Sequence, residues 1–126
     1  MKLKKGVKLL AAIAGTGPLV ERQQRYVLAL RLWLNHGERV NLPNQCLSHA
    51  VAEPTKVHAD GFFEHQVRID RENLIAGIFY AVQGMRIGGY RKVAISPHLA
   101  YGEKGIPGVI PANAKLTVEI RVLRQV

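Results

Sequence analysis

The sequence contains one cysteine, few aromatic residues and no long apolar run. The single cysteine, Cys46, can form neither an internal disulfide nor a thiolate zinc cluster, so folding must depend on packing. No apolar segment reaches the about 18 to 20 residues that span a bilayer, so no membrane association is expected. Aromatic residues make up 6% of the chain, whereas 48% is hydrophobic and 21% charged. This composition excludes a disordered chain and, at 126 residues, predicts a single domain over residues 1–126.

Basic residues outnumber acidic ones by 18 to 9, which gives a formal net charge of +9. The densest cluster is formed by four lysines at the start of the chain, Lys2, Lys4, Lys5 and Lys8. Elsewhere arginine and lysine alternate with apolar residues, as on the solvated face of a sheet. Because charge alone gives only non-specific attraction, a solvated basic surface is the favoured interpretation. Nucleic acid is therefore not expected as a partner, and it stays open only as a third function class that depends on net charge.

The N-terminal segment allows two interpretations. A charged start followed by the apolar segment Val7–Gly15 has the order of a secretory signal, but Lys8 interrupts the apolar part and leaves it short. We therefore favour a short basic arm at residues 1–6, a first strand at residues 8–14 and a turn at residues 15–18. A single unpaired cysteine also fits a reducing compartment, so a cytoplasmic location is expected, with a secreted or periplasmic one as the alternative.

Alternating apolar residues predict strands. In residues 25–34 the apolar side chains on one side are Tyr26, Leu28, Leu30, Leu32 and Leu34. This spacing predicts a strand whose leucine face lies on the core. Trp33 falls on the opposite side, where it is expected either to meet solvent or to lie under the segment at residues 42–65. The same alternation predicts strands at residues 90–95 and 115–122.

From Asn73 onward, before the last two predicted strands, the apolar spacing is that of a helix of about three turns. Its apolar stripe consists of Ile75, Ile78, Phe79, Val82 and Met85. Asp70 or Asn73 is expected to cap its start, and Gly84 to end it. Residues 42–65 and 98–114 are rich in proline, glycine and polar side chains and are predicted to be loops. Strands around one short amphipathic helix indicate an α+β domain with an antiparallel sheet.

Patterns typical of acid–base, nucleophilic or metal chemistry are weak. Cys46 and His49 lie close in sequence, but no oxyanion site or third orienting group accompanies them. The spacing of His49, His58 and His65 does not aim two imidazoles at one metal, so no metal site is expected. Gly84–Gly89 has the glycines of a phosphate loop, but it follows a helix and precedes a strand, the reverse of the order such loops need.

Five motifs follow one another in the C-terminal half: Gln83–Gly89 (QGMRIGG), Ile95–Pro97 (ISP), Leu99–Gly102 (LAYG), Gly108–Pro111 (GVIP) and Asn113–Ala114. In order and spacing, residues 74–123 resemble the FKBP-type peptidyl-prolyl isomerases. The N-terminal half agrees more loosely, with an apparent insertion between Asn41 and His65. The resemblance implies an FKBP-like fold, in which an antiparallel sheet wraps around one short helix. It also implies rotation of X-Pro bonds in proline-containing polypeptides, without a cofactor.

That reaction needs an apolar cup rather than an acid or a base. The barrier to peptide rotation, about 18 to 20 kcal/mol, comes from amide resonance. Water stabilises the charge-separated resonance form, so a dry site around the proline ring favours the twisted amide. The resemblance implies that Tyr101 donates from its hydroxyl to a bound ligand and that Ile75, after Leu74, donates its backbone N–H. The remaining matched positions are the apolar flap, Val109 and Ile110, and the small residue Ala100.

Several pocket positions depart from the family pattern. Ile78 stands where the family commonly has a tryptophan, and Val118 where it has a phenylalanine. In the looser N-terminal register four more positions differ, with aliphatic or polar residues at Leu30, Val40, Asn41 and His65. The candidate catalytic residues are Tyr101, Ile75, Ile78 and Val118, and the candidate substrate-binding residues are Leu74, Ala100, Val109, Ile110, Leu30, Asn41 and Val40.

These departures leave two functions open. Each aromatic ring that an aliphatic residue replaces takes away about 150 to 250 Å² of surface, so the cup keeps its apolar character but loses area for the proline ring. The first function is an FKBP-type isomerase of low activity. The alternative is a non-catalytic FKBP-fold module with a degenerate pocket, which binds a partner protein through residues 42–65 or through the face that carries Trp33.

Overall fold

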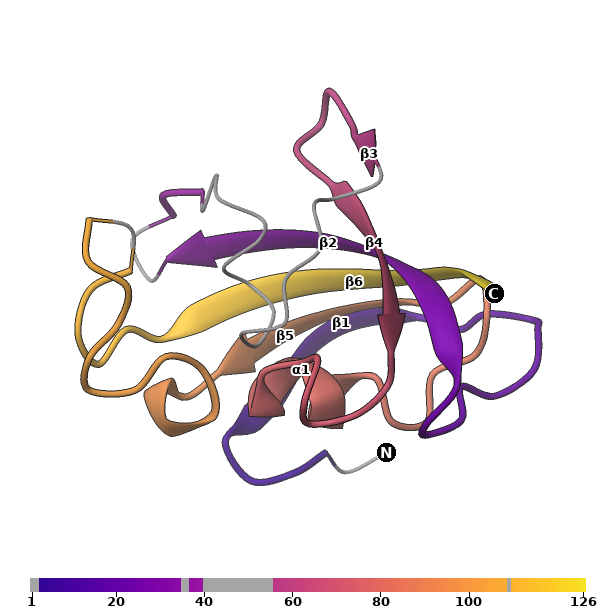
Figure 1. Ribbon diagram of the computed structural model, residues 1–126, viewed down its shortest axis with the longest axis horizontal. Coiled ribbons are helices and arrows are strands. Elements are labelled where there is room, and N and C mark those ends of the chain that lie inside the picture. The colour runs from indigo at the N-terminus through magenta and orange to yellow at the C-terminus, as the bar shows by residue number, and fades with distance from the viewer. Residues whose placement is uncertain (1–2, 35–36, 40–55, 109) are drawn as a thin grey trace.

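The computed structural model describes residues 3–34, 37–39, 56–108 and 110–126 (Figure 1). Within these ranges, six strands form one sheet in the order β1-β5-β6-β2-β4-β3, and each neighbouring pair is antiparallel. The strands are β1 (Val7–Ile13), β2 (Arg25–Leu34), β3 (Lys56–Val57), β4 (Phe63–Arg68), β5 (Tyr90–Ile95) and β6 (Leu116–Gln125). The helices are α1 (Ala76–Ala81) and the short 3-10 helix η2 (Pro97–Leu99).

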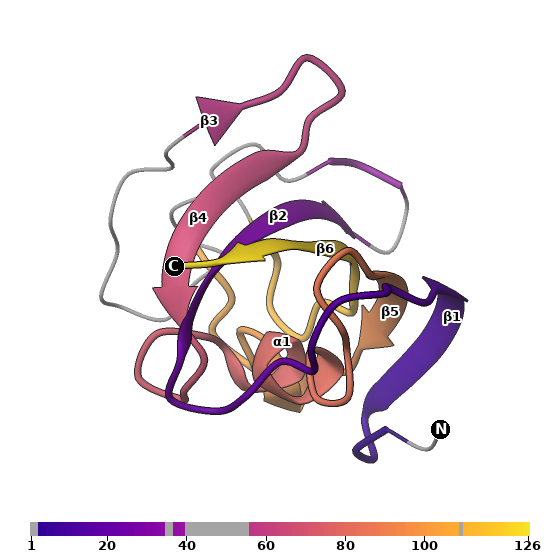
Figure 2. The same ribbon diagram turned by 90° about the vertical axis from the view of Figure 1, so that its right-hand side faces the viewer.

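The sheet curves around α1, which lies against its concave face (Figures 1 and 2). The predicted α+β class, with an antiparallel sheet wrapped around one short helix, is thereby confirmed. In the described ranges, no helix is both long enough and apolar enough to cross a membrane.

Side-chain alternation puts the predicted apolar faces of β2 and β6 on the core. Register aligns Leu30 with Ile120 and Leu32 with Val118, so the apolar residues of the two central strands lie side by side. All of these four side chains are 0% exposed. Trp33 lies on the opposite, outer face and is half-buried there. The predicted leucine face is therefore confirmed.

The helix is shorter than the sequence predicts. It spans six residues, and its N-cap is Ile75, which makes no side-chain capping bond, so neither Asp70 nor Asn73 caps it. The Asp70 carboxylate instead accepts from the backbone N–H groups of Glu72 and Asn73, at 3.0 and 2.9 Å, and closes the turn before the helix. The apolar stripe is longer than α1 because that turn and the residues after Ala81 also pack on the core.

The end of α1 is held by a buried arginine rather than by Gly84. Arg91, on β5, is 7% exposed, and its Nη1 donates to the carbonyl oxygens of Ala81 and Gln83, both at 2.7 Å. These bonds satisfy carbonyls that the last turn of a helix leaves without partners. Gly84 follows with φ 80° and turns the chain toward β5.

The loop predicted at residues 42–65 is also shorter than expected. Residues 42–55 lie outside the described residues, but residues 56–65 include β3 and the start of β4. On β4, Phe63, His65 and Val67 point inward and are at most 6% exposed. The buried polar residue His65 interrupts what would otherwise be a recognisable apolar alternation, and for that reason the strand was not predicted.

Gly77 sets how closely α1 approaches the sheet. A Cβ at this position would lie 2.3 Å from Cγ2 of Ile95, a β5 residue that is 0% exposed and cannot move aside.

We expect Gly77→Ala to destabilise the fold by about 1 to 3 kcal/mol, because overpacking outweighs the gain of up to about 1 kcal/mol in helix propensity. Urea unfolding measures the change. In an Ile95→Ala background the clash is gone, so the same substitution should become neutral or stabilising. A loss of equal size in both backgrounds would contradict this account.

Candidate functional site

Four of the candidate residues form a buried apolar floor between α1 and the sheet. They come from separate parts of the chain: Leu30 from β2, Leu74 from the turn before α1, Ile78 from α1 and Val118 from β6. Each is 0% exposed, and all belong to one continuous apolar cluster. The structure therefore brings together residues that are up to 88 positions apart in the chain, from Leu30 to Val118.

Four further candidates surround this floor. Ile75 and Ile110 are buried but retain 7% and 3% exposure, and Ala100 and Tyr101 are half-buried. Ile75 and Ile110 belong to the same cluster as the floor, and Ala100 and Tyr101 pack against it. All eight described candidates therefore lie in or against one apolar cluster, and Ile75, Ile110, Ala100 and Tyr101 are those that retain exposure.

Ile75 offers a backbone donor beside the floor. It is extended, with φ −61° and ψ 153°, and its carbonyl accepts from the N–H of Phe79 at 3.0 Å, which starts the helix. Among the described residues none accepts a hydrogen bond from the Ile75 N–H. As the N-cap residue, Ile75 belongs to the part of a helix whose N–H groups have no partner within the helix.

The turn before α1 fixes the position of this donor. Leu74 donates its N–H to the Asp70 carbonyl at 3.2 Å, and Arg71 Nη1 donates to the Leu74 carbonyl at 2.6 Å. Burial acts to raise the pKa of the Asp70 carboxyl, but the ion pair with Arg68 and the hydrogen bonds from Asn73 outweigh it. Together they hold that pKa below its ordinary value of 3.8.

Backbone bonds hold the loop that carries the rim residues. Gly105 donates to the Tyr101 carbonyl at 3.0 Å, and the backbones of Ile106 and Ile110 exchange two bonds of 2.8 Å. Gly105 has φ 60°, and a Cβ there would lie 2.2 Å from the Ile110 carbonyl oxygen. Only glycine fits this close approach between the backbones of residues 105 and 110.

Three of the candidate residues, Val40, Asn41 and Val109, lie outside the described residues. Cys46 and His49 lie outside them as well. Within the described ranges, no group of three His, Cys, Asp or Glu side chains gathers closely enough to hold a metal ion.

The inner face of β4 adds two rings to the interior that the candidate residues do not include. His65 is 1% exposed, and its ring meets that of Phe63 edge-on, with centroids 5.3 Å apart. Register places His65 opposite Leu28 of β2, one inward position along that strand from Leu30. His65 is one of the pocket positions at which the sequence departs from the family pattern, whereas Phe63 is identified only by its place two residues before His65 on the inner face of β4.

The arrangement is suited to binding an apolar group without covalent chemistry. It combines a dry floor, a backbone N–H at Ile75 and a half-buried phenol at Tyr101. The family model described as FKBP-type peptidyl-prolyl cis-trans isomerase matches residues 55–123, which is more than half of the chain. The chain belongs to this family, as the motifs from Gln83 to Ala114 indicated.

The sequences of known proteins match part of this chain. FK506-binding protein 4 of Aspergillus fumigatus is 43% identical over 56 residues, which are 44% of this chain and 11% of that protein. FK506-binding protein 1A of Neurospora crassa is 40% identical over 55 residues, which are 44% of this chain and 46% of that protein. The matched region is thus less than half the length of either relative.

Solved structures match nearly the whole chain at the level of the fold. A peptidyl-prolyl cis-trans isomerase from Pseudomonas syringae has a TM-score of 0.67 at 24% identity, and the match covers 97% of this chain and 82% of that one. FkpA from Escherichia coli has a TM-score of 0.68 at 24% identity, with 97% and 52% covered. The fold is therefore FKBP-like.

Asp70 gives the turn before α1 a pH-dependent stability. Because the folded-state pKa is lowered, its contribution is complete above the unfolded value and is lost as pH falls through the folded one. Asp70→Asn should lower the free energy of unfolding at neutral pH by about 1.5 to 3 kcal/mol, the worth of hydrogen bonds to a charged group.

The difference between parent and Asp70→Asn should shrink as the pH is lowered below the ordinary value of 3.8. Urea unfolding at constant ionic strength between acid and neutral pH measures it. Glu103→Gln, at an exposed position, is the matched control and should change little. A difference that stays constant at all pH values would show that the carboxylate charge is not involved.

Proposed function

We propose that the chain accelerates cis-trans rotation of X-Pro bonds at the site between α1 and the sheet. The observation that supports this most directly is the buried floor of Leu30, Leu74, Ile78 and Val118, next to the Ile75 N–H. A proline ring that packs on the partly exposed Ile75, Ile110 and Ala100 above this floor would leave water, and its apolar surroundings would no longer stabilise the charge-separated form of the amide. Family membership supports the same reaction class.

Each described rim residue has a part in this proposal. The Ile75 N–H would bind a carbonyl of the peptide, and the Tyr101 hydroxyl would hold a second acceptor. Ile110 and Ala100 would close the apolar surface over the ring. No group transfers a proton or forms a covalent bond, so catalysis depends on the dry apolar floor and on two donors at its edge.

We further propose that the activity is low. Ile78 and Val118 give the floor branched aliphatic side chains where the family commonly has rings, so a bound proline loses contact area. These aliphatic residues are themselves 0% exposed, which indicates that the surrounding core has closed around the smaller side chains.

The test is a protease-coupled isomerisation assay on X-Pro peptides. We expect the parent to exceed the uncatalysed rate. Tyr101→Phe should lower kcat/KM about twofold to tenfold, the loss of one hydrogen bond. Tyr80→Phe is the matched control, because Tyr80 lies on α1 outside the floor and stacks edge-on against Phe79. It should leave the rate unchanged.

Restoring ring surface tests the assignment of the floor. Ile78→Trp should raise kcat/KM if the protein still folds, and Val118→Phe provides a second route should the larger ring overpack the core. Exchange spectroscopy on a labelled X-Pro peptide separates binding from catalysis. A parent that binds the peptide without speeding its exchange, and gains nothing from either ring, would support the non-catalytic binding module.

A further inference from the structure

Strand register collects basic side chains on the outer face of the sheet, away from α1. Three neighbouring rows cross β1, β5, β6 and β2 in that order. The rows are Lys8, Ala94, Thr117 and Trp33; Ala11, Lys92, Glu119 and Arg31; and Ile13, Tyr90, Arg121 and Ala29. They contain four basic side chains and one carboxylate. We call this set of residues the outer basic face.

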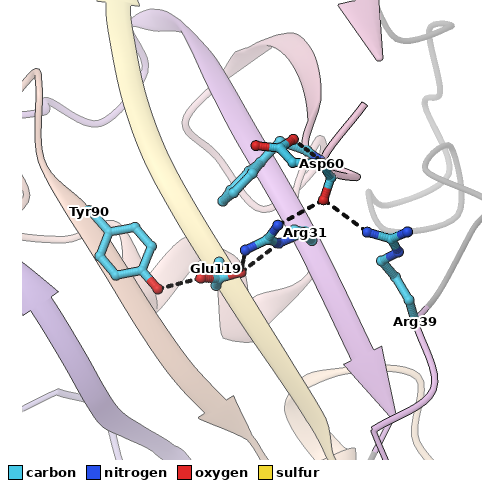
Figure 3. A network of polar contacts seen from close by, with 6 residues as sticks. Arg31, Arg39, Asp60, Tyr90 and Glu119 are labelled. Carbon is cyan, nitrogen blue, oxygen red and sulfur yellow. Dashed lines mark hydrogen bonds and ion pairs between the residues drawn. The ribbon is translucent and has the colours of Figure 1, made fainter. Parts of the chain in front are cut away.

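The one carboxylate of the outer basic face is already neutralised (Figure 3). Glu119 accepts from Arg31 Nε at 2.7 Å and from the hydroxyl of Tyr90. Burial, together with the bond to Glu119 and its negative charge, raises the pKa of Tyr90 to about 12, so the phenol stays protonated and donates. Arg31 is fixed further by its bond to the Asp60 carbonyl at 2.7 Å.

Three cations of the face are then left for an external anion: Lys8, which is exposed on β1, and the pair Lys92 and Arg121. Arg121 is exposed and Lys92 half-buried, and neither forms an ion pair within 4 Å among the described residues. Aromatic rings hold both in place: Arg121 lies 5.1 Å from the Tyr90 centroid, and Lys92 lies 5.7 Å from that of Trp33. A cation fixed on a ring loses less conformational entropy when it binds a phosphate.

Net charge alone does not favour a nucleic-acid partner, but the arrangement of cations and rings on this face does, and we propose that the outer basic face binds single-stranded nucleic acid. Successive phosphates would meet Lys8, Lys92 and Arg121, and bases would stack on the half-exposed rings of Trp33 and Tyr90 or on guanidinium planes. The face is convex, because the strands arch over α1 (Figure 2). A flexible strand can follow that curvature, whereas a duplex needs an element that protrudes into a groove.

The net charge of +9 attracts an anionic strand to the protein over a longer distance than the contacts of the face alone. The small side chains of Ala94, Thr117 and Ala11 lie between the cations, so a strand can lie close to the sheet. This site is on the opposite face from the proline site, and the proposal does not depend on isomerase activity.

The experiment uses the full chain with a fluorescein-labelled 15-nucleotide oligo(dT) and oligo(U), read by anisotropy at several salt concentrations. Trp33 is the single tryptophan of the chain, so quenching of its fluorescence reports contact with the face directly. We expect binding that weakens steeply with salt. Lys92→Gln with Arg121→Gln should reduce affinity at least tenfold at low salt and lower the salt slope by about 1.4, at 0.7 per phosphate contact.

The matched control is Lys5→Gln with Lys104→Gln, which removes the same charge at exposed positions outside the outer basic face. It should keep most of the affinity. An equal loss in both double variants would overturn the proposal in favour of general charge attraction, as would the absence of binding at low salt.

Two further measurements distinguish single-stranded nucleic acid from other possible ligands of the outer basic face. Tighter binding to a duplex of the same length would overturn the single-strand assignment, and displacement of the oligonucleotide by an equal charge concentration of polyglutamate would favour an acidic protein partner. Far-UV circular dichroism confirms that the variants are folded. If the parent raises the anisotropy of the oligonucleotide but its Trp33 fluorescence is not quenched, the oligonucleotide binds elsewhere on the protein and the proposal is wrong.

Discussion

The packing of α1 into the curved sheet is the contact on which the rest of the structure depends. A helix of six residues has no independent stability in water, so its conformation must come from the surfaces around it. Gly77 allows the helix to approach Ile95 of β5, and Arg91 from the same strand binds the carbonyls at the helix end. β5 therefore determines both the depth of the helix and the place where it stops.

That contact also creates the candidate site. The floor under the proposed proline site is itself part of the hydrophobic core, because Ile78 and Val118 are 0% exposed and belong to the core cluster. A change at either position alters packing density and binding surface together. This coupling explains how aliphatic residues at Ile78 and Val118 are compatible with a well-packed core.

The two faces of the same strands have opposite chemistry. Along β6, Val118 and Ile120 point to the core, whereas Glu119 and Arg121 point outward. Period-two geometry forces this separation, so a single strand carries part of the apolar floor and part of the outer basic face. The charged surface and the apolar site are therefore positioned by one sheet but do not share side chains.

The sequence alone was sufficient to predict β2 and β6, because the alternation of apolar residues is a local property. The motifs from Gln83 to Ala114 can likewise be read directly in the sequence. It also indicated the family and the candidate residues around Tyr101 and Ile75. The strand at Phe63–Arg68 was not predicted, because burying a histidine in a core position runs against the local pattern.

The start of α1 was placed too early for a related reason. Asp70 and Asn73 both have the side chains of an N-cap, and only the fold determined that Asp70 closes the preceding turn instead. The assembly of the floor from residues as distant as Leu30 and Val118, and the alignment of cations from separate strands into rows, also depend on register between strands. Register is a long-range property, set when apolar faces are buried against each other, and no local pattern contains it.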